Sequence, residues 1–262
     1  MNVYLYELKA NRKFITTWLI VILSIGLVML SFYPTIFKDM DAFIKMMENY
    51  PKNIRDAFGM NLNTMGSLLG YYSSFPLTFI TICAAMEATI LGVSILSKEI
   101  RDKTADFLFT KPLSRMKIIT SKLLASISLL ALSNLILIFG AYLLLLMFSK
   151  TSFSFSVFLL LTSAVFIIQL VFFAIGILVS VLLPKVKAPI SISMAIVFGF
   201  YALGVIVDEK MRLINPFKYF DSVYIIENTS YELKYLLATF VVIVSSTVLT
   251  YIIYKKKDIH SV

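Results

Sequence analysis

One ionisable side chain lies in the middle of a long apolar segment. Glu87 stands between Met86 and Ala88. If this segment crosses a membrane, a charge at that depth costs about 2.5–3.5 kcal/mol, so such acids usually face a cavity or a partner. Two interpretations stay open: Glu87 lines a path for a proton, a cation or a cationic substrate, or it is a protonated or hydrogen-bonded carboxyl that joins neighbouring segments.

Two amide side chains have similar surroundings. Asn134 and Gln169 each lie inside a different apolar segment. Hydrogen bonding between helices is the usual role of amides in such positions. We expect this role for both residues, and we group them with Glu87 as candidates for a substrate path.

The polar stretch 98–122 combines helix-capping residues with an apolar face. Thr104 is a residue type that caps helices, Asp106 falls in the first turn, where negative charge suits the helix dipole, and Pro112 predicts an end to the helix. Ser114 predicts the start of the next helix. Apolar residues lie on one face of the short helix: Ala105, Leu108 and Phe109. A helix of about two turns is not stable alone, so either the inner membrane leaflet or a partner must cover it.

Other kinds of chemistry are absent from the sequence. One cysteine, Cys83, and one histidine, His260, give neither a disulfide framework nor a Cys/His zinc cluster. No Gly-x-x-x-x-Gly-Lys-Ser/Thr motif is present to bind phosphates, and no nucleophile–base pair lies in the apolar segments. Five methionines in 34–70 have thioethers of the kind that binds Cu(I), but methionine at helical spacing is usually apolar packing. We predict no catalytic residue, no metal site and no cofactor bound by this chain.

Six hydrophobic segments position these residues. The chain is 59% hydrophobic and 15% charged, whereas soluble domains average about 45–50% and about 25%. Each segment has about the 20 apolar residues that a membrane-spanning helix needs, and lipid requires helices because a helix satisfies its own backbone hydrogen bonds. We therefore expect one all-α domain, 1–262, with six transmembrane helices. The predicted spans are 14–33, 77–96, 123–148, 157–183, 188–207 and 235–254.

Basic residues are distributed unevenly between the two sides of these spans. Counted on alternate sides from the N-terminus, one side holds 15 of the 24 Lys and Arg residues and the other holds 9. The positive-inside rule makes the richer side cytoplasmic, which places both termini inside and the chain in the cytoplasmic (inner or plasma) membrane. The formal charge of +9 thus sets orientation toward anionic lipid, and we expect no nucleic-acid partner.

Two longer connections lie on the other side. The loop 34–70 has apolar residues at helical spacing, which predicts helices that lie on the membrane surface or cap the bundle. The loop 208–234 is interrupted at Asn215-Pro216 and mixes aromatic with charged residues.

The stretch 98–122 also carries a spaced pattern. Its elements are Glu99, Lys103-Thr104, Asp106-Phe107-Leu108, Pro112-Leu113-Ser114-Arg115 and Lys122. The pattern resembles the cytoplasmic loop of the ABC-2 type transporter permeases, in which Gly more often stands where this chain has Lys103. Weaker matches extend the resemblance over nearly the whole chain, at Tyr50-Pro51, Phe58-Gly59, the run 215–220 and the ending 254–259.

The resemblance implies a type V exporter-like fold and an ATP-driven function. The short helix would be a coupling helix that docks on a separate cytoplasmic ABC ATPase, which binds ATP and Mg. Two ATPases and two permeases, as a homodimer, would form the complex. The resemblance further implies export of a hydrophobic peptide, an antibiotic or a lipid-like molecule.

The same resemblance assigns roles along the loop. Phe107, Leu108 and Phe109 would supply the buried contact, while Glu99, Arg115 and Lys122 would hold the loop against neighbouring helices or the ATPase rim. The implied coupling residues are Glu99, Arg101, Thr104, Asp106, Phe107, Leu108, Phe109, Pro112, Arg115 and Lys122.

Two alternatives stay open. An ion-gradient-driven secondary transporter would use Glu87, although the paired interrupted segments that such folds usually show are missing here. An immunity or sensor protein would use the same architecture to transmit a signal without transport.

Overall fold

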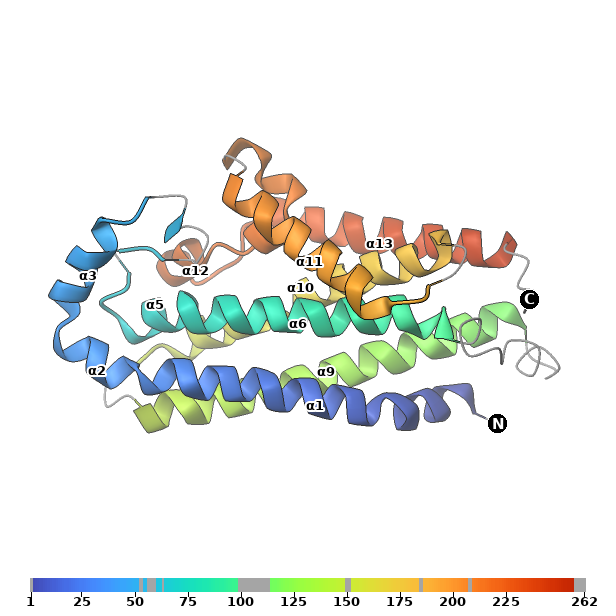
Figure 1. Cartoon of the computed structure of the whole chain (residues 1–262), viewed down its shortest axis with the longest axis horizontal. Coiled ribbons are helices and arrows are strands. Elements are labelled where there is room, and N and C mark those ends of the chain that lie inside the picture. The colour runs from blue at the N-terminus through green and yellow to red at the C-terminus, as the bar shows by residue number, and fades with distance from the viewer. Residues whose placement is uncertain are drawn as a thin grey trace.

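The computed structural model describes residues 2–51, 54–55, 60–62, 64–98, 114–148, 152–183, 186–206 and 209–256. Within these ranges the regular structure is helical, and long helices lie side by side in an elongated bundle (Figure 1). The long helices are α1 (Val3–Ser31), α6 (Phe75–Ile95), α9 (Arg115–Phe148), α10 (Phe155–Leu182), α11 (Pro189–Ile206) and α13 (Leu233–Lys256).

The two ends of the bundle differ. We call the end at which α1 begins the N-terminal end; α6 ends there, and α9 begins there (Figure 1). Most of the short elements gather at the opposite, distal end, among them α2 and α3, which follow α1. The short elements are α2 (Tyr33–Lys38), α3 (Met40–Glu48), α5 (Leu68–Ser73), η1 (Glu209–Ile214), η2 (Pro216–Lys218) and α12 (Ser222–Asn228).

Five of the six predicted spans coincide with helices that are long and apolar enough to cross a membrane. These stretches are Val3–Lys38, Leu68–Ile95, Arg115–Phe148, Phe155–Leu182 and Leu233–Lys256. The predicted span 188–207 corresponds to α11, whose apolar part, Pro189–Gly204, is shorter. A sixth crossing therefore stays a prediction.

Two helices begin well before the predicted apolar runs, because polar side chains cap them. In α1 the Asn2 side chain accepts a hydrogen bond from the Tyr4 N–H at 3.1 Å, so the helix includes the polar residues that precede 14–33. In α9 the Ser114 hydroxyl accepts from the Lys117 N–H at 3.3 Å, which confirms the predicted start at that serine. Both extensions lie at the N-terminal end of the bundle.

Helix α6 lies at the centre of the packing. In the stretch Leu68–Ile95, 72% of the most apolar window is buried, against 28% for Val3–Lys38 and 17% for Leu233–Lys256. The outer helices leave large side chains such as Leu135 and Phe240 uncovered, each 65% exposed. Apolar residues buried inside and uncovered outside are what a bundle surrounded by lipid requires.

Helices α6 and α10 approach each other closely at two glycines. A Cβ atom on Gly92 would lie 2.6 Å from the Phe173 carbonyl oxygen, and one on Gly176 would lie 2.8 Å from the Thr89 carbonyl oxygen. Small residues allow membrane helices to pack backbone against backbone in this way. Glycine is therefore required sterically at both positions.

The predicted amphipathic loop forms α2 and α3 at the distal end. Met47, Met60 and Met65 are buried together, and Phe43 and Phe75 pack against them. This arrangement is the apolar packing expected of these methionines, whereas Met46 is 49% exposed. Among the described residues, no group of three or more His, Cys, Asp or Glu side chains is placed to hold a metal ion.

Candidate functional site

Most of the predicted coupling residues fall outside the residues that the structure describes. These are Glu99, Arg101, Thr104, Asp106, Phe107, Leu108, Phe109 and Pro112. Their roles stay predictions from the sequence. The structure does describe the two flanks of that segment, which end at Lys98 and resume at Ser114.

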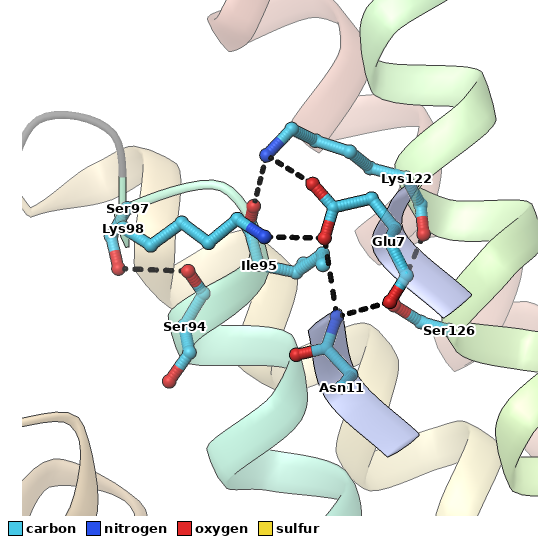
Figure 2. A network of polar contacts seen from close by, with 8 residues as sticks. All are labelled: Glu7, Asn11, Ser94, Ile95, Ser97, Lys98, Lys122 and Ser126. Atoms are coloured by element: carbon cyan, nitrogen blue, oxygen red, sulfur yellow. Dashed lines mark hydrogen bonds and ion pairs between the residues drawn. The ribbon is translucent and has the colours of Figure 1, made fainter. Parts of the chain in front are cut away.

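A buried carboxylate joins the two flanks to the N-terminal helix (Figure 2). Glu7 of α1 is 1% exposed. Its Oε2 forms an ion pair with Lys98, just beyond the end of α6, and its Oε1 lies 3.2 Å from the Nζ of Lys122 on α9. We call Glu7, Lys98 and Lys122 the ionic cluster.

Further hydrogen bonds fix the members of the ionic cluster. The Asn11 side chain, one turn along α1, donates to the Glu7 Oε2 at 3.1 Å and to the Glu7 carbonyl at 3.0 Å. Lys122 also donates to the Ile95 carbonyl at 2.9 Å, at the end of α6, where carbonyls lack partners within the helix. Each charged atom therefore replaces lost hydration with polar contacts, which is the condition under which proteins tolerate buried ions.

The structure thus places the two described members of the predicted coupling set differently. Lys122 is 1% exposed and contacts neighbouring helices. Arg115 is partly exposed and begins α9. Of the two placements that the resemblance implied for Lys122, the geometry shows the contact with neighbouring helices.

Glu7 is not among the residues predicted from the sequence to form a site. Glu7 precedes the predicted first span, in a stretch where Lys9, Arg12 and Lys13 mark a membrane flank. The available signal was the spacing of Glu7 and Asn11, which are four residues apart and so share a helix face. The partners themselves are distant in sequence, and no local pattern points to them.

A second buried polar network crosses the middle of the bundle. Glu87 of α6 is fully buried, and its Oε2 accepts a hydrogen bond from the Gln169 amide of α10 at 2.8 Å. The Gln169 Oε1 in turn accepts from the Asn134 amide of α9, which also donates to the Leu130 carbonyl at 3.1 Å. We call Glu87, Gln169 and Asn134 the amide chain.

The amide chain unites the three residues that the sequence grouped by type alone. Its bonds run between three helices, as expected for polar side chains inside apolar spans. Among the described residues Glu87 takes part in no ion pair; its neighbours include Ser133 of α9. The amide chain therefore joins α6, α9 and α10 at a depth where apolar side chains otherwise fill the interior.

Comparison with known protein families identifies the family of this protein. A family model described as ABC-2 family transporter protein matches residues 1–259. The chain belongs to the ABC-2 transporter family. No match was found among curated proteins or solved structures.

Membership gives the two polar networks a context. An ABC-2 permease is a membrane-spanning transporter subunit that does not itself catalyse a reaction, and membership implies partnership with an ABC ATPase subunit. In this ABC-2 permease, the ionic cluster lies beside the flanks of the stretch that resembles the ATPase-binding loop. The amide chain lies within the bundle.

Proposed function

We propose that this ABC-2 permease couples ATP hydrolysis on a separate ATPase to the export of an apolar or amphipathic substrate through the cytoplasmic membrane. The observation that carries the proposal is the family match over nearly the whole chain, together with the patterned loop around Thr104 and Pro112. Since the sequence has no phosphate-binding loop, the energy must come from a partner.

The described flanks support the proposed route of coupling. The end of α6 and the start of α9 lie at the same end of the bundle, and Lys122 connects them through the Ile95 carbonyl. Displacement of the segment between them would therefore act on α6, the most buried of the stretches long enough to span. In this arrangement each of two permeases binds one ATPase through its segment 99–113. That segment lies on the side of the membrane where we place both termini.

The interior of the bundle is filled with apolar side chains, which affects where a substrate could pass. Two apolar clusters fill the bundle, one including Phe172 and Leu91 and the other including Phe158 and Tyr72. Large apolar surfaces on α1, α9 and α13 remain for lipid or for another chain. We therefore place the substrate path between two copies of the permease, with a hydrophobic peptide, an antibiotic or a lipid-like molecule as the substrate class.

The test uses the tagged chain and the ATPase that co-purifies with it, reconstituted in phosphatidylethanolamine–phosphatidylglycerol vesicles. Leu108→Asp should lower the permease-dependent ATPase rate at least about tenfold, because a carboxylate in an apolar contact costs more than the 1.4 kcal/mol that a factor of ten represents. Leu108→Met, which keeps an apolar side chain, is the matched control. The mass of the wild-type complex should correspond to two permeases and two ATPases.

Other outcomes point to the alternatives. Full ATPase stimulation by Leu108→Asp, at equal insertion in the membrane, would show that the predicted helix does not dock. Substrate accumulation in vesicles that contain the chain alone, driven by a pH or sodium gradient, would favour secondary transport through Glu87. Stimulation of the ATPase without movement of any substrate in a peptide and lipid panel would favour a sensor or immunity role.

A further inference from the structure

The ionic cluster sits where three helices and both flanks of one segment converge. Glu7 comes from α1, Lys98 from just beyond the end of α6, and Lys122 from α9, about two turns after Arg115 (Figure 2). Lys98 is the last described residue before 99–113. One carboxylate therefore binds a cation from each side of that segment.

We propose that Glu7 is a positioning residue that ties both flanks of 99–113 to the N-terminal helix, so that α1 moves with them when the ATPase acts. The inference rests on the proposed function and extends the route of coupling to α1, which the sequence pattern of the loop does not involve. Glu7 acts through Lys98 and Lys122 and touches neither ATP nor the transported molecule.

Burial keeps the cluster closed. Glu7 and Lys122 are each 1% exposed, and the side chain of Lys98 is 19% exposed. Separation of the charges would leave ions in a weakly polar interior without compensation, which is far more costly than separation of an exposed pair. Asn11 donates a further hydrogen bond to Glu7, and the Ile95 carbonyl accepts one from Lys122, so both buried members of the cluster have an additional polar partner.

The packing of α1 allows it to follow the cluster. Among the long helices, α1 packs chiefly on α9 and α6. Its uncovered surface carries charged residues such as Lys9 near the start of the helix and large apolar residues such as Ile20 and Val28 farther along. Movement of the flanks therefore meets lipid along most of α1, and few protein contacts resist it. In this way α1 moves together with α9 and the end of α6.

Lysine labelling tests the geometry independently of function. Acylation of the wild-type chain in open membranes should modify Lys9 and Lys117, which are exposed on the same two helices, while Lys122 stays at least about tenfold slower. Glu7→Gln should raise the labelling of Lys98 and Lys122. Rapid labelling of Lys122 in the wild type would show that the cluster is not closed in the membrane and would overturn the proposal.

ATPase measurements then test the role. Glu7→Gln should lower permease-dependent ATP hydrolysis, per folded permease, about tenfold, since the amide keeps the size of the side chain but removes the charge that both lysines share. Glu7→Asp should retain part of the stimulation. Lys9→Gln and Lys117→Gln are the matched controls and should behave as wild type.

The outcomes separate this inference from the proposed function. A purely structural Glu7 would reduce the yield of folded permease and leave stimulation per folded molecule unchanged, and that result would overturn the proposal. If Glu7→Gln does not fold, Lys98→Gln replaces it, because this change keeps the buried Glu7–Lys122 pair and should still lower stimulation. Failure of the wild-type chain to stimulate any ATPase would instead refute the proposed function.

Discussion

Glu7 and Glu87 are both buried in this permease, but their surroundings differ. Glu7 at the N-terminal end faces two lysine side chains, whereas Glu87 in the middle of the bundle accepts a hydrogen bond from an amide. Both side chains are almost completely buried, at 1% and 0% exposure. The degree of burial therefore does not distinguish their roles; the charge of their neighbours does.

The difference follows from depth. At the N-terminal end of the bundle, lysine stems extend along apolar surface while their ammonium groups reach the carboxylate, so a charged cluster can form. In the middle, cations are costly in lipid, and neutral amides serve as partners. The ionic cluster can hold the flanks of 99–113 by charge, and the amide chain can join the spans by hydrogen bonds.

The largest expected effect comes from removal of the carboxylate of the ionic cluster. Glu7→Ala should lower the free energy of unfolding by about 3–5 kcal/mol, because both lysines lose the anion that they share while Lys122 stays buried. Thermal unfolding of the detergent-solubilised protein measures the loss, with Lys9→Ala as the exposed control on the same helix. A loss no larger than that of the control would remove the contrast between the two glutamates.

A smaller effect is expected in the amide chain. Gln169→Leu removes the donor to Glu87 and the acceptor of Asn134, so two buried polar groups lose a bond at a cost of about 1–3 kcal/mol. The same unfolding measurement applies. Gln169→Glu keeps the size but replaces the donor with a second acid, and it should destabilise the protein more than leucine does at neutral pH.

The smallest effect is expected for Glu87→Gln. The side chain keeps its shape and can still accept from Gln169, so the free energy of unfolding should change by less than about 1 kcal/mol. Transport by this variant across a range of pH decides the functional question: an unchanged profile means that Glu87 joins helices only. A lost pH dependence would show that Glu87 is part of the translocation path, which would give the amide chain the more active role.

The sequence predicted the elements better than their contacts. Hydrophobic length predicted the five long apolar stretches, because lipid imposes a minimum length on any spanning helix. Side-chain type predicted the cap at Ser114 and the interhelical role of Asn134 and Gln169, since amides in apolar spans have few other uses. These features depend on local properties, which a single sequence contains.

The ionic cluster depends on contacts that no local property encodes. Glu7 and Lys98 are 91 positions apart, and their encounter requires that α1 and the end of α6 meet at one level of the bundle. The early start of α1 was missed for a related reason. The expected boundary followed the apolar run, whereas the helix continues through polar residues that the cluster and the Asn2 cap stabilise.

The contact between Gly92 and Gly176 has a practical consequence for mutagenesis. Alanine scanning assumes that the new residue removes atoms, but at these two positions alanine adds a methyl group where a carbonyl oxygen of the facing helix already lies within 3 Å. In an alanine scan along α6, a loss of stability at position 92 would come from an added methyl group, whereas a loss at position 87 would come from a removed carboxyl group. In variant libraries of this protein, alanine or serine at Gly92 or Gly176 adds volume. A loss of function at these positions therefore reports a steric clash and does not identify a residue that takes part in transport.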